Sequence, residues 1–150
     1  MNSLQTVSLQ GIETSLAEAI LNRIQKIPVF NGLGVEILAF EPGVCIAKVP
    51  RQTHLDGIYE SFHGGLLMTV ADTIACFAVM TMTGPDEVMT TTDMNIRFLA
   101  PCLTAVTAKA KAIKVGKTMC PVGVELFDDN EKLVAVAQVN YMRLPAIPNR

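Results

Sequence analysis

Asp72 combines a reactive carboxylate with a position in the middle of a long apolar run, residues 66–82. A carboxylate that loses water must be paired, hydrogen-bonded or protonated, because burying an uncompensated charge costs much free energy. Two interpretations follow, and the physics gives them about equal weight. Asp72 is either a structural residue that satisfies neighbouring polar groups, or a general base or nucleophile in a mostly dry site.

The tripeptide His63-Gly64-Gly65 comes directly before this apolar run. The first amide groups of a helix lack partners, and together with the helix dipole they attract negative charge. Glycine also lets a ligand approach the backbone closely. The tripeptide therefore predicts either a helix cap with a tight turn, which is the default for two glycines, or an oxyanion site with a backbone N–H donor.

The spacing of Gly64 and Asp72 limits how they can cooperate. They are eight residues apart, and a helix rises 1.5 Å per residue, so they stand about 12 Å apart on one helix. Reacting groups must approach to roughly 3.5 Å. One carbonyl can therefore touch both residues only if two such helices run antiparallel across a twofold axis, which requires at least a dimer.

The composition is typical of one ordinary globular domain, residues 1–150, with an N-terminal helical segment over residues 1–28. Half of the residues are hydrophobic and 17% are charged, which excludes disorder and indicates a large buried surface. The net charge of -2 supplies no field that attracts nucleic acid or an anionic membrane. We therefore expect neither as a partner.

Cysteine, histidine and hydropathy patterns exclude further classes. The four cysteines are far apart, without a Cys-x-x-Cys pair, which favours reduced thiols in a cytoplasmic protein. His54 has no second ligand at metal spacing, so we expect no metal site.

Residues 1–10 lack the features of a secretory signal. In residues 66–82 a central carboxylate opposes membrane insertion by about 2.5 to 3.5 kcal/mol, so we expect a helix inside the protein.

Hydrophobic periodicity predicts the order of the elements. An amphipathic helix is expected over residues 12–27, ended by Pro28, and a central helix, apolar on all sides, over residues 65–82. Alternation and turn residues predict strands at 35–40, 44–49, 88–99, 104–115, 118–127 and 133–144. We therefore expect an α+β fold in which one curved antiparallel sheet wraps around one central helix.

Several motifs together resemble a known enzyme family. His63-Gly64-Gly65 is followed after four residues by Val70-Ala71-Asp72, then by Thr91-Thr92-Asp93-Met94-Asn95-Ile96 with Pro101 after it. This pattern resembles the hotdog-fold acyl-CoA thioesterases of the phenylacetate-degradation type. The resemblance runs from about residue 35 to residue 143, and it implies a hotdog fold and hydrolysis of acyl-CoA thioesters by a homodimer or homotetramer.

The resemblance also implies roles for four residues. The catalytic carboxylate falls on Asp72, as general base or as nucleophile, and the oxyanion amide falls on Gly64 of the neighbouring subunit. His63 shapes the turn or assists at the carbonyl, and Thr91 supplies the hydroxyl that positions water. Strand alternation groups Thr91 with the more polar side chains of its strand, so that it borders a subunit interface or a bulge re-aims it.

One position departs from the family pattern. Many relatives have an asparagine six residues before the His-Gly-Gly motif, where this chain has Gly57. The neighbouring Asp56 is a substitute only in part, because an ionised carboxylate accepts hydrogen bonds and cannot donate one.

Coenzyme A, as part of the substrate, requires cationic contacts for its phosphates. The segment Lys114-Val115-Gly116-Lys117-Thr118 matches a basic turn of the family, although exposed lysines of a strand and its turn are the ordinary interpretation. We expect Arg97 and the stretch from Phe98 to Leu103 to form a second wall of the coenzyme A site.

No separate cofactor is expected. The alternatives are an acyl-thioester hydratase or dehydratase, which would need a histidine near the reacting carbons, and a non-catalytic acyl-CoA binding protein.

Overall fold

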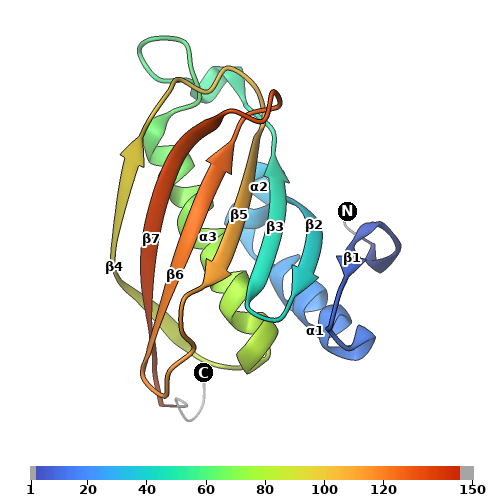
Figure 1. The fold of residues 1–150 in the computed structure, drawn as a ribbon. Coiled ribbons are helices and arrows are strands. Elements are labelled where there is room, and N and C mark those ends of the chain that lie inside the picture. The colour runs from blue at the N-terminus through green and yellow to red at the C-terminus, as the bar shows by residue number, and fades with distance from the viewer. Residues whose placement is uncertain (1–2, 146–150) are drawn as a thin grey trace.

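A seven-stranded curved sheet wraps around one long helix in the computed structural model, which describes residues 3–145 (Figure 1). The strands are β1 (Ser8–Leu9), β2 (Glu36–Glu41), β3 (Val44–Val49), β4 (Met89–Phe98), β5 (Val106–Ala112), β6 (Met119–Phe127) and β7 (Leu133–Arg143). Their spatial order is β1-β2-β3-β5-β6-β7-β4. All neighbours are antiparallel except β1 and β2, so the α+β fold predicted from the sequence is confirmed.

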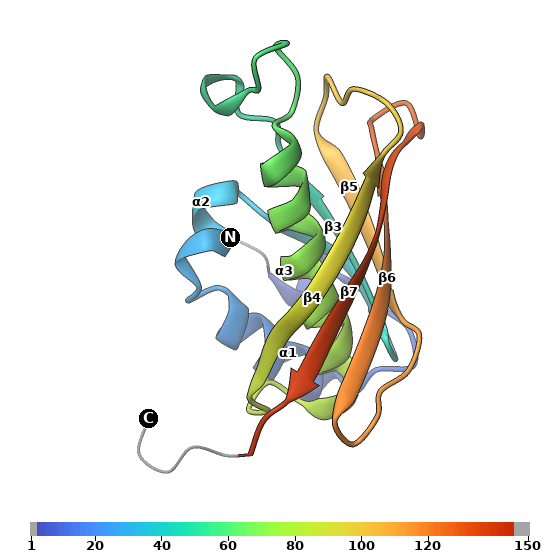
Figure 2. The same cartoon turned by 90° about the vertical axis from the view of Figure 1, so that its left-hand side faces the viewer.

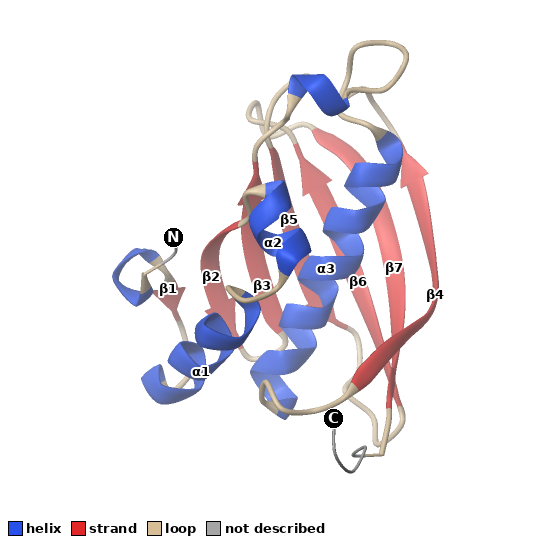
Figure 3. Cartoon of the chain, turned by 180° about the vertical axis from the view of Figure 1, so that it is seen from behind, coloured by secondary structure: helices blue, strands red, loops and turns tan. Residues whose placement is uncertain are grey.

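The central helix α3 (Gly64–Thr83) extends one residue beyond the predicted range at each end. It crosses the concave face of the sheet, as Figure 3 shows from behind, and packs chiefly on β3, β5 and β6. Small buried residues on these strands let the helix approach closely. They include Ala47, Ala108 and Ala110.

The single protomer covers only part of α3, which was expected to lie inside the protein. The helix is long and apolar enough to span a membrane, yet just over half of its most apolar stretch is buried inside the protein. One stripe of side chains along the helix is only half-buried: Met68, Thr69, Asp72, Thr73 and Cys76. Elsewhere the helix packs chiefly on the sheet and also contacts α1.

The N-terminal part of the chain is only partly helical. A 3-10 turn (Leu4–Thr6) and β1 precede α1 (Thr14–Ile24), and residues 1–2 lie outside the described range. The prediction of one helix to residue 27, ended by Pro28, is wrong. Pro28 begins a second short helix, α2 (Pro28–Leu33), because proline at the first helical position needs no N–H and already has a helical φ.

Strand β4 forms the edge of the sheet opposite β1 and pairs only with β7. Figure 2 shows it facing the viewer, with α3 beside it. Its pairing register shifts once, since Thr91 pairs with Tyr141 while Asp93 pairs with Asn140. Thr92 is therefore the extra residue of a β-bulge.

Candidate active site

Asp72 lies half-buried near the middle of α3, where two hydroxyl groups bind its carboxylate. Thr91 Oγ1 donates a hydrogen bond to Asp72 Oδ1 at 2.8 Å. Tyr141 OH donates to the same oxygen at 2.7 Å and also contacts the main-chain oxygen of Asp72. Within residues 3–145, Oδ2 of Asp72 has no hydrogen-bond partner, so one oxygen is held and the other is free to react.

The bulge at Thr92 explains how Thr91 reaches Asp72. Simple alternation places Thr91 on the opposite face from Met94 and Ile96, which lie half-buried against the core. One extra residue reverses this parity. Of the two interpretations left open by the sequence, the structure therefore shows the bulge that re-aims Thr91.

Tyr141 was missed by sequence analysis. It lies on β7, and only 5% of it is exposed. Burial raises the pKa of its hydroxyl well above the usual range, and the hydrogen bond to Asp72 raises it further, so Tyr141 keeps its proton and acts as a donor. One feature of the sequence could have indicated it. Tyr141 lies two residues after Val139 on the same strand and therefore faces the same buried side, where a tyrosine hydroxyl requires a hydrogen-bond partner.

Cys76 follows Asp72 by one turn of α3. Burial is the main cause that raises its pKa to about 12, with a further contribution from the charge of Asp72. Cys76 is therefore a neutral thiol and a poor nucleophile at neutral pH. All four cysteines are free, as predicted, and Cys45, Cys102 and Cys120 are buried.

Gly64 presents a free amide at the start of α3. His63 caps the helix, since its Nδ1 accepts a hydrogen bond from the N–H of Gly65 at 2.9 Å, and its carbonyl accepts from Leu66 and Leu67. Within the described residues, the N–H of Gly64 has no acceptor. The start of α3 is thus capped by His63 and also offers the N–H of Gly64 as a free donor, and the helix dipole makes this end of the helix electropositive.

The capping bond also fixes the chemistry of His63. Because Nδ1 accepts a hydrogen bond, the proton of the neutral ring belongs on Nε2. His63 is exposed, and a side chain on Gly57 would begin 3.9 Å from its Cδ2 atom. Gly57, which the family resemblance aligns with an asparagine, therefore lies beside His63 and has no side chain to contact it.

Asp56 does not fill that position, because Arg51 occupies its carboxylate. Arg51 Nε donates to Oδ1 at 2.9 Å and Nη2 donates to Oδ2. The guanidinium also donates to the carbonyls of Leu103 and Glu60. The hydrogen bonds from Arg51 lower the pKa of Asp56, so this carboxylate stays ionised and holds the loop rather than a substrate.

The expected coenzyme A contacts lie at two ends of the protomer. The ring of Phe98 packs near Gly64, since a Cβ atom there would lie 3.3 Å from Phe98 Cζ, and Arg97 beside it is exposed. The turn between β5 and β6 lies at the other end, where Arg143 donates to the carbonyl of Gly116 at 3.0 Å. One protomer does not bring the two groups together.

The basic turn combines a structural glycine with exposed polar groups. Gly116 closes the turn through a bond from its N–H to the carbonyl of Met119, and a Cβ atom would lie 2.6 Å from that oxygen. Lys114, Lys117 and Thr118 are exposed. In the described part of the chain neither lysine has a salt-bridge partner, so both are available to a phosphate.

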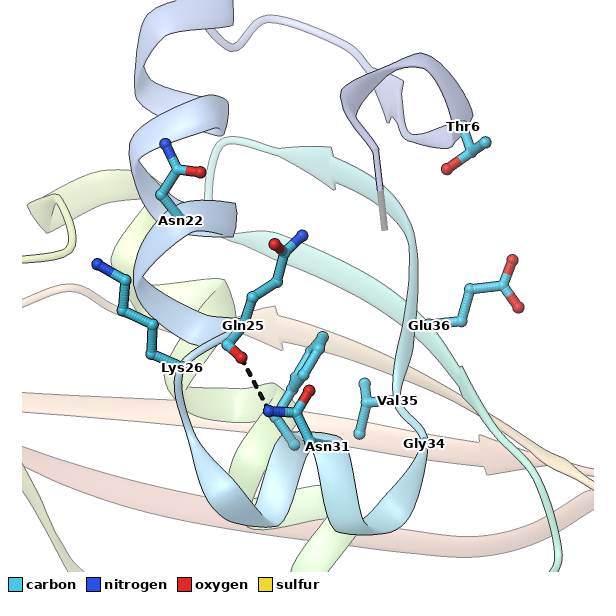
Figure 4. Close-up of a pocket in the computed structure, with 9 residues that line it drawn as sticks. Thr6, Asn22, Gln25, Lys26, Asn31, Gly34, Val35 and Glu36 are labelled. Carbon is cyan, nitrogen blue, oxygen red and sulfur yellow. Dashed lines mark hydrogen bonds between the residues drawn. The ribbon is translucent and has the colours of Figure 1, made fainter. Parts of the chain in front are cut away.

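One cavity lies away from Asp72. It has a volume of about 820 Å³ and is lined by residues of α1, α2, β2 and the segments beside them, including Thr6. The buried Phe30 is one of its lining residues. The exposed polar side chains that line it include Asn22, Lys26, Asn31 and Glu36 (Figure 4). Nothing in the sequence indicated a binding or catalytic site in this cavity.

Over residues 3–145, no group of three or more His, Cys, Asp or Glu side chains is arranged to hold a metal ion.

Comparison with known proteins places this geometry in a family. Residues 59–135, about half of the chain, match the model of the Thioesterase superfamily. A 1,4-dihydroxy-2-naphthoyl-CoA hydrolase of Listeria monocytogenes is 26% identical over 107 residues, covering 71% of this chain and 87% of the relative. A protein of Saccharolobus solfataricus that is provisionally named an esterase is 30% identical over 112 residues, 73% of each chain.

Solved structures match the fold at low sequence identity. The PaaI protein of the E. coli phenylacetic acid degradation operon superposes with a TM-score of 0.81 at 20% identity, covering 90% of this chain and 97% of that one. A thioesterase of Haemophilus influenzae gives a TM-score of 0.77 at 23% identity, covering 87% and 92%. The chain therefore belongs to the thioesterase superfamily, an enzyme family, and has the hotdog fold.

Proposed function

We propose that the protein hydrolyses acyl-CoA thioesters to a free acid and coenzyme A, with Asp72 as the catalytic carboxylate. The observation that carries this proposal is the pair of hydroxyls on Asp72 Oδ1, which holds the carboxylate and leaves Oδ2 free. The similarity to a CoA hydrolase supports the same reaction class.

The proposed reaction needs only water and the thioester. Asp72 accepts a proton from water, and the resulting hydroxide adds to the acyl carbon. The N–H of Gly64 and the dipole of α3 stabilise the negative oxygen of the tetrahedral intermediate. The C–S bond then breaks, the thiolate of coenzyme A receives the proton from Asp72, and the acid is released. Direct attack of Asp72 on the acyl carbon, followed by hydrolysis of the anhydride, is the other route. No separate cofactor is proposed.

We further propose that each site uses Gly64 of one protomer and Asp72 of another. About 12 Å of helix separates them within one chain. The unpaired edge of β4 and the half-exposed stripe of α3 support an interface with a second copy. The large apolar side chains exposed nearby, Phe98, Leu99 and Leu103, also support one. The assembly is a dimer or a dimer of dimers.

This arrangement also accounts for the two separated groups of expected coenzyme A contacts. If two protomers run antiparallel, the basic turn of one lies at the same end as Arg97 and Phe98 of the other. One protomer would then contact the phosphates through Lys114 and Lys117 and through the neighbouring Gly116 and Thr118. The four free cysteines support a reducing, cytoplasmic location.

The test of the reaction is release of free thiol from a panel of acyl-CoA substrates. The panel contains short, medium and long acyl chains, one enoyl-CoA, and an aromatic acyl group, because one relative is named for an aromatic CoA ester. We expect thiol release whose rate saturates with concentration for at least one of these substrates. Loss of the enoyl chromophore without thiol release would indicate a hydratase, and tight binding without turnover would indicate a binding protein; either result contradicts the proposal.

Asp72→Asn is the matching variant. It keeps the shape of the side chain and both hydroxyl contacts, but removes the base, so we expect thiol release to fall about 10²- to 10⁴-fold with folding intact. Asp86→Asn, at an exposed carboxylate outside the site, is the control. Unchanged turnover in Asp72→Asn would refute the assignment.

A further inference from the structure

Tyr141 is the one ionisable side chain whose hydrogen bond reaches the proposed catalytic carboxylate, within the part of the chain that the structure describes. It comes from β7, 69 residues after Asp72 in the chain, and lies outside residues 59–135, the range matched by the family model. Its hydroxyl lies between the main-chain oxygen and Oδ1 of Asp72. The contact therefore joins β7 to the middle of α3.

A purely structural tyrosine would not need this second contact. A buried hydroxyl requires one partner, and the main-chain oxygen of Asp72 already supplies it. The hydroxyl nevertheless also lies 2.7 Å from Oδ1. A bulge in β4 brings Thr91 to the same oxygen at 2.8 Å. Two donors from different strands thus converge on one atom of the carboxylate.

We propose that Tyr141 is a positioning residue, which together with Thr91 fixes Oδ1 of Asp72 so that Oδ2 is the oxygen that reacts. The inference rests on the proposed thioester hydrolysis. Two donors on Oδ1 fix the rotation of the carboxylate, which keeps the reacting oxygen at one place before substrate binds. They also stabilise the ionised form, which is the form that accepts a proton.

The other titratable groups around Asp72 do not compete for this role. Cys76 lies one turn along α3, and burial raises its pKa to about 12. Cys45 on β3 and Arg23 on α1 interact with Cys76, and burial also raises the pKa of Cys45. Both thiols are therefore neutral at neutral pH and place no charge beside Asp72.

Tyr141→Phe tests the proposal, because it keeps the ring and removes only the hydroxyl. We expect kcat to fall about tenfold or more, since a hydrogen bond to a charged group is lost, while KM changes little. The acidic limb of kcat/KM is expected to move to higher pH, because the carboxylate loses a donor that favours its ionised form. Tyr59→Phe is the matched control, since Tyr59 is 87% exposed and is the only other tyrosine.

A second measurement covers the case in which Tyr141→Phe folds poorly. In the Tyr59→Phe protein, biosynthetic incorporation of a fluorinated tyrosine labels position 141 alone. Its more acidic phenol donates a stronger hydrogen bond, so the acidic limb should move to lower pH, opposite to the shift in Tyr141→Phe.

The outcomes separate the two proposals. If Asp72→Asn abolishes thiol release but neither change at Tyr141 moves kcat or the acidic limb, the inference about Tyr141 is overturned and the proposed function stands. If Asp72→Asn keeps full thiol release, the proposed function itself fails. Opposite shifts of the limb for phenylalanine and for the fluorinated tyrosine support the positioning role.

Discussion

At the scale of single residues, the main inference concerns one amide and one carboxylate. The N–H of Gly64 has no acceptor among residues 3–145, and Oδ2 of Asp72 has no donor there. Polar groups left without partners in a folded protein are informative, because most are satisfied. In a thioesterase, a free donor at a helix start and a free carboxylate oxygen are complementary parts of one acyl-transfer site.

Gly64→Pro removes the amide hydrogen with little disturbance to the helix. Gly64 is the first helical residue, where proline is favoured, and His63 before it has φ −57° and ψ 129°, which suits a residue before proline. We expect kcat to fall about 10²- to 10³-fold, as for loss of an oxyanion donor. The measurement is steady-state thiol release.

Gly64→Ala is the matched control, because alanine adds the same first carbon beside Phe98 but keeps the N–H. It should retain activity within a few-fold of the wild type. Equal losses in the two variants would show that contact with Phe98, rather than the amide hydrogen, is responsible, and would contradict the oxyanion assignment.

Asp72 and Gly64 were candidates from the sequence because their residue types and their places in one helix form a local pattern, and Thr91 was a candidate through the family resemblance. Tyr141 was not found, since its contact with Asp72 depends on how β7 lies against α3, which no local pattern encodes. The same reason explains Asp56. Its carboxylate was a candidate by position alone, and only the fold shows that Arg51 occupies it.

At the scale of elements, the bulge in β4 and the loop before α3 set the geometry of the site. Alternation predicted the limits of β4 closely but left the face of Thr91 open, because only the fold shows that one extra residue at Thr92 reverses the parity. Pro28 was read as the end of a helix and is instead the start of α2. In both places a residue is compatible with two local structures, and tertiary packing selects one.

The ion pair of Arg51 and Asp56 gives the loop a pH-dependent stability. The pKa of Asp56 in the folded protein lies below its ordinary value of 3.8, so its contribution is present above about pH 4 and is lost as the pH falls through the folded pKa. Asp56→Asn should therefore lower the free energy of unfolding at pH 7, and the difference from the wild type should shrink as the pH falls below about 4.

Denaturant unfolding at fixed protein concentration measures this difference, since the stability of an oligomer depends on concentration. Glu131→Gln serves as a control at an exposed acidic residue without a salt bridge among the described residues. A difference between Asp56→Asn and the wild type that stays constant from pH 7 to acid would contradict the role of the ion pair.

At the scale of the whole molecule, the account depends on two protomers sharing each site. The single protomer leaves the edge of β4 unpaired and a stripe of α3 half-exposed, and it holds Gly64 and Asp72 about 12 Å apart along the same helix. The separation of Gly64 and Asp72 could be predicted from the sequence, because it follows from the helical rise alone. The half-exposed stripe of α3 could not be predicted, since the hydrophobic periodicity showed only that the helix is apolar.

The most direct test of the shared site is complementation between two inactive variants. Protomers with Asp72→Asn and protomers with Gly64→Pro, carrying different affinity tags, are co-expressed, and the mixed dimer is isolated. One of its two sites then combines an intact Gly64 with an intact Asp72 from the other protomer, while the second site carries both changes. We predict thiol release at about half the wild-type rate per dimer, although each parent variant is nearly inactive. A mixed dimer no more active than its parents would contradict the account.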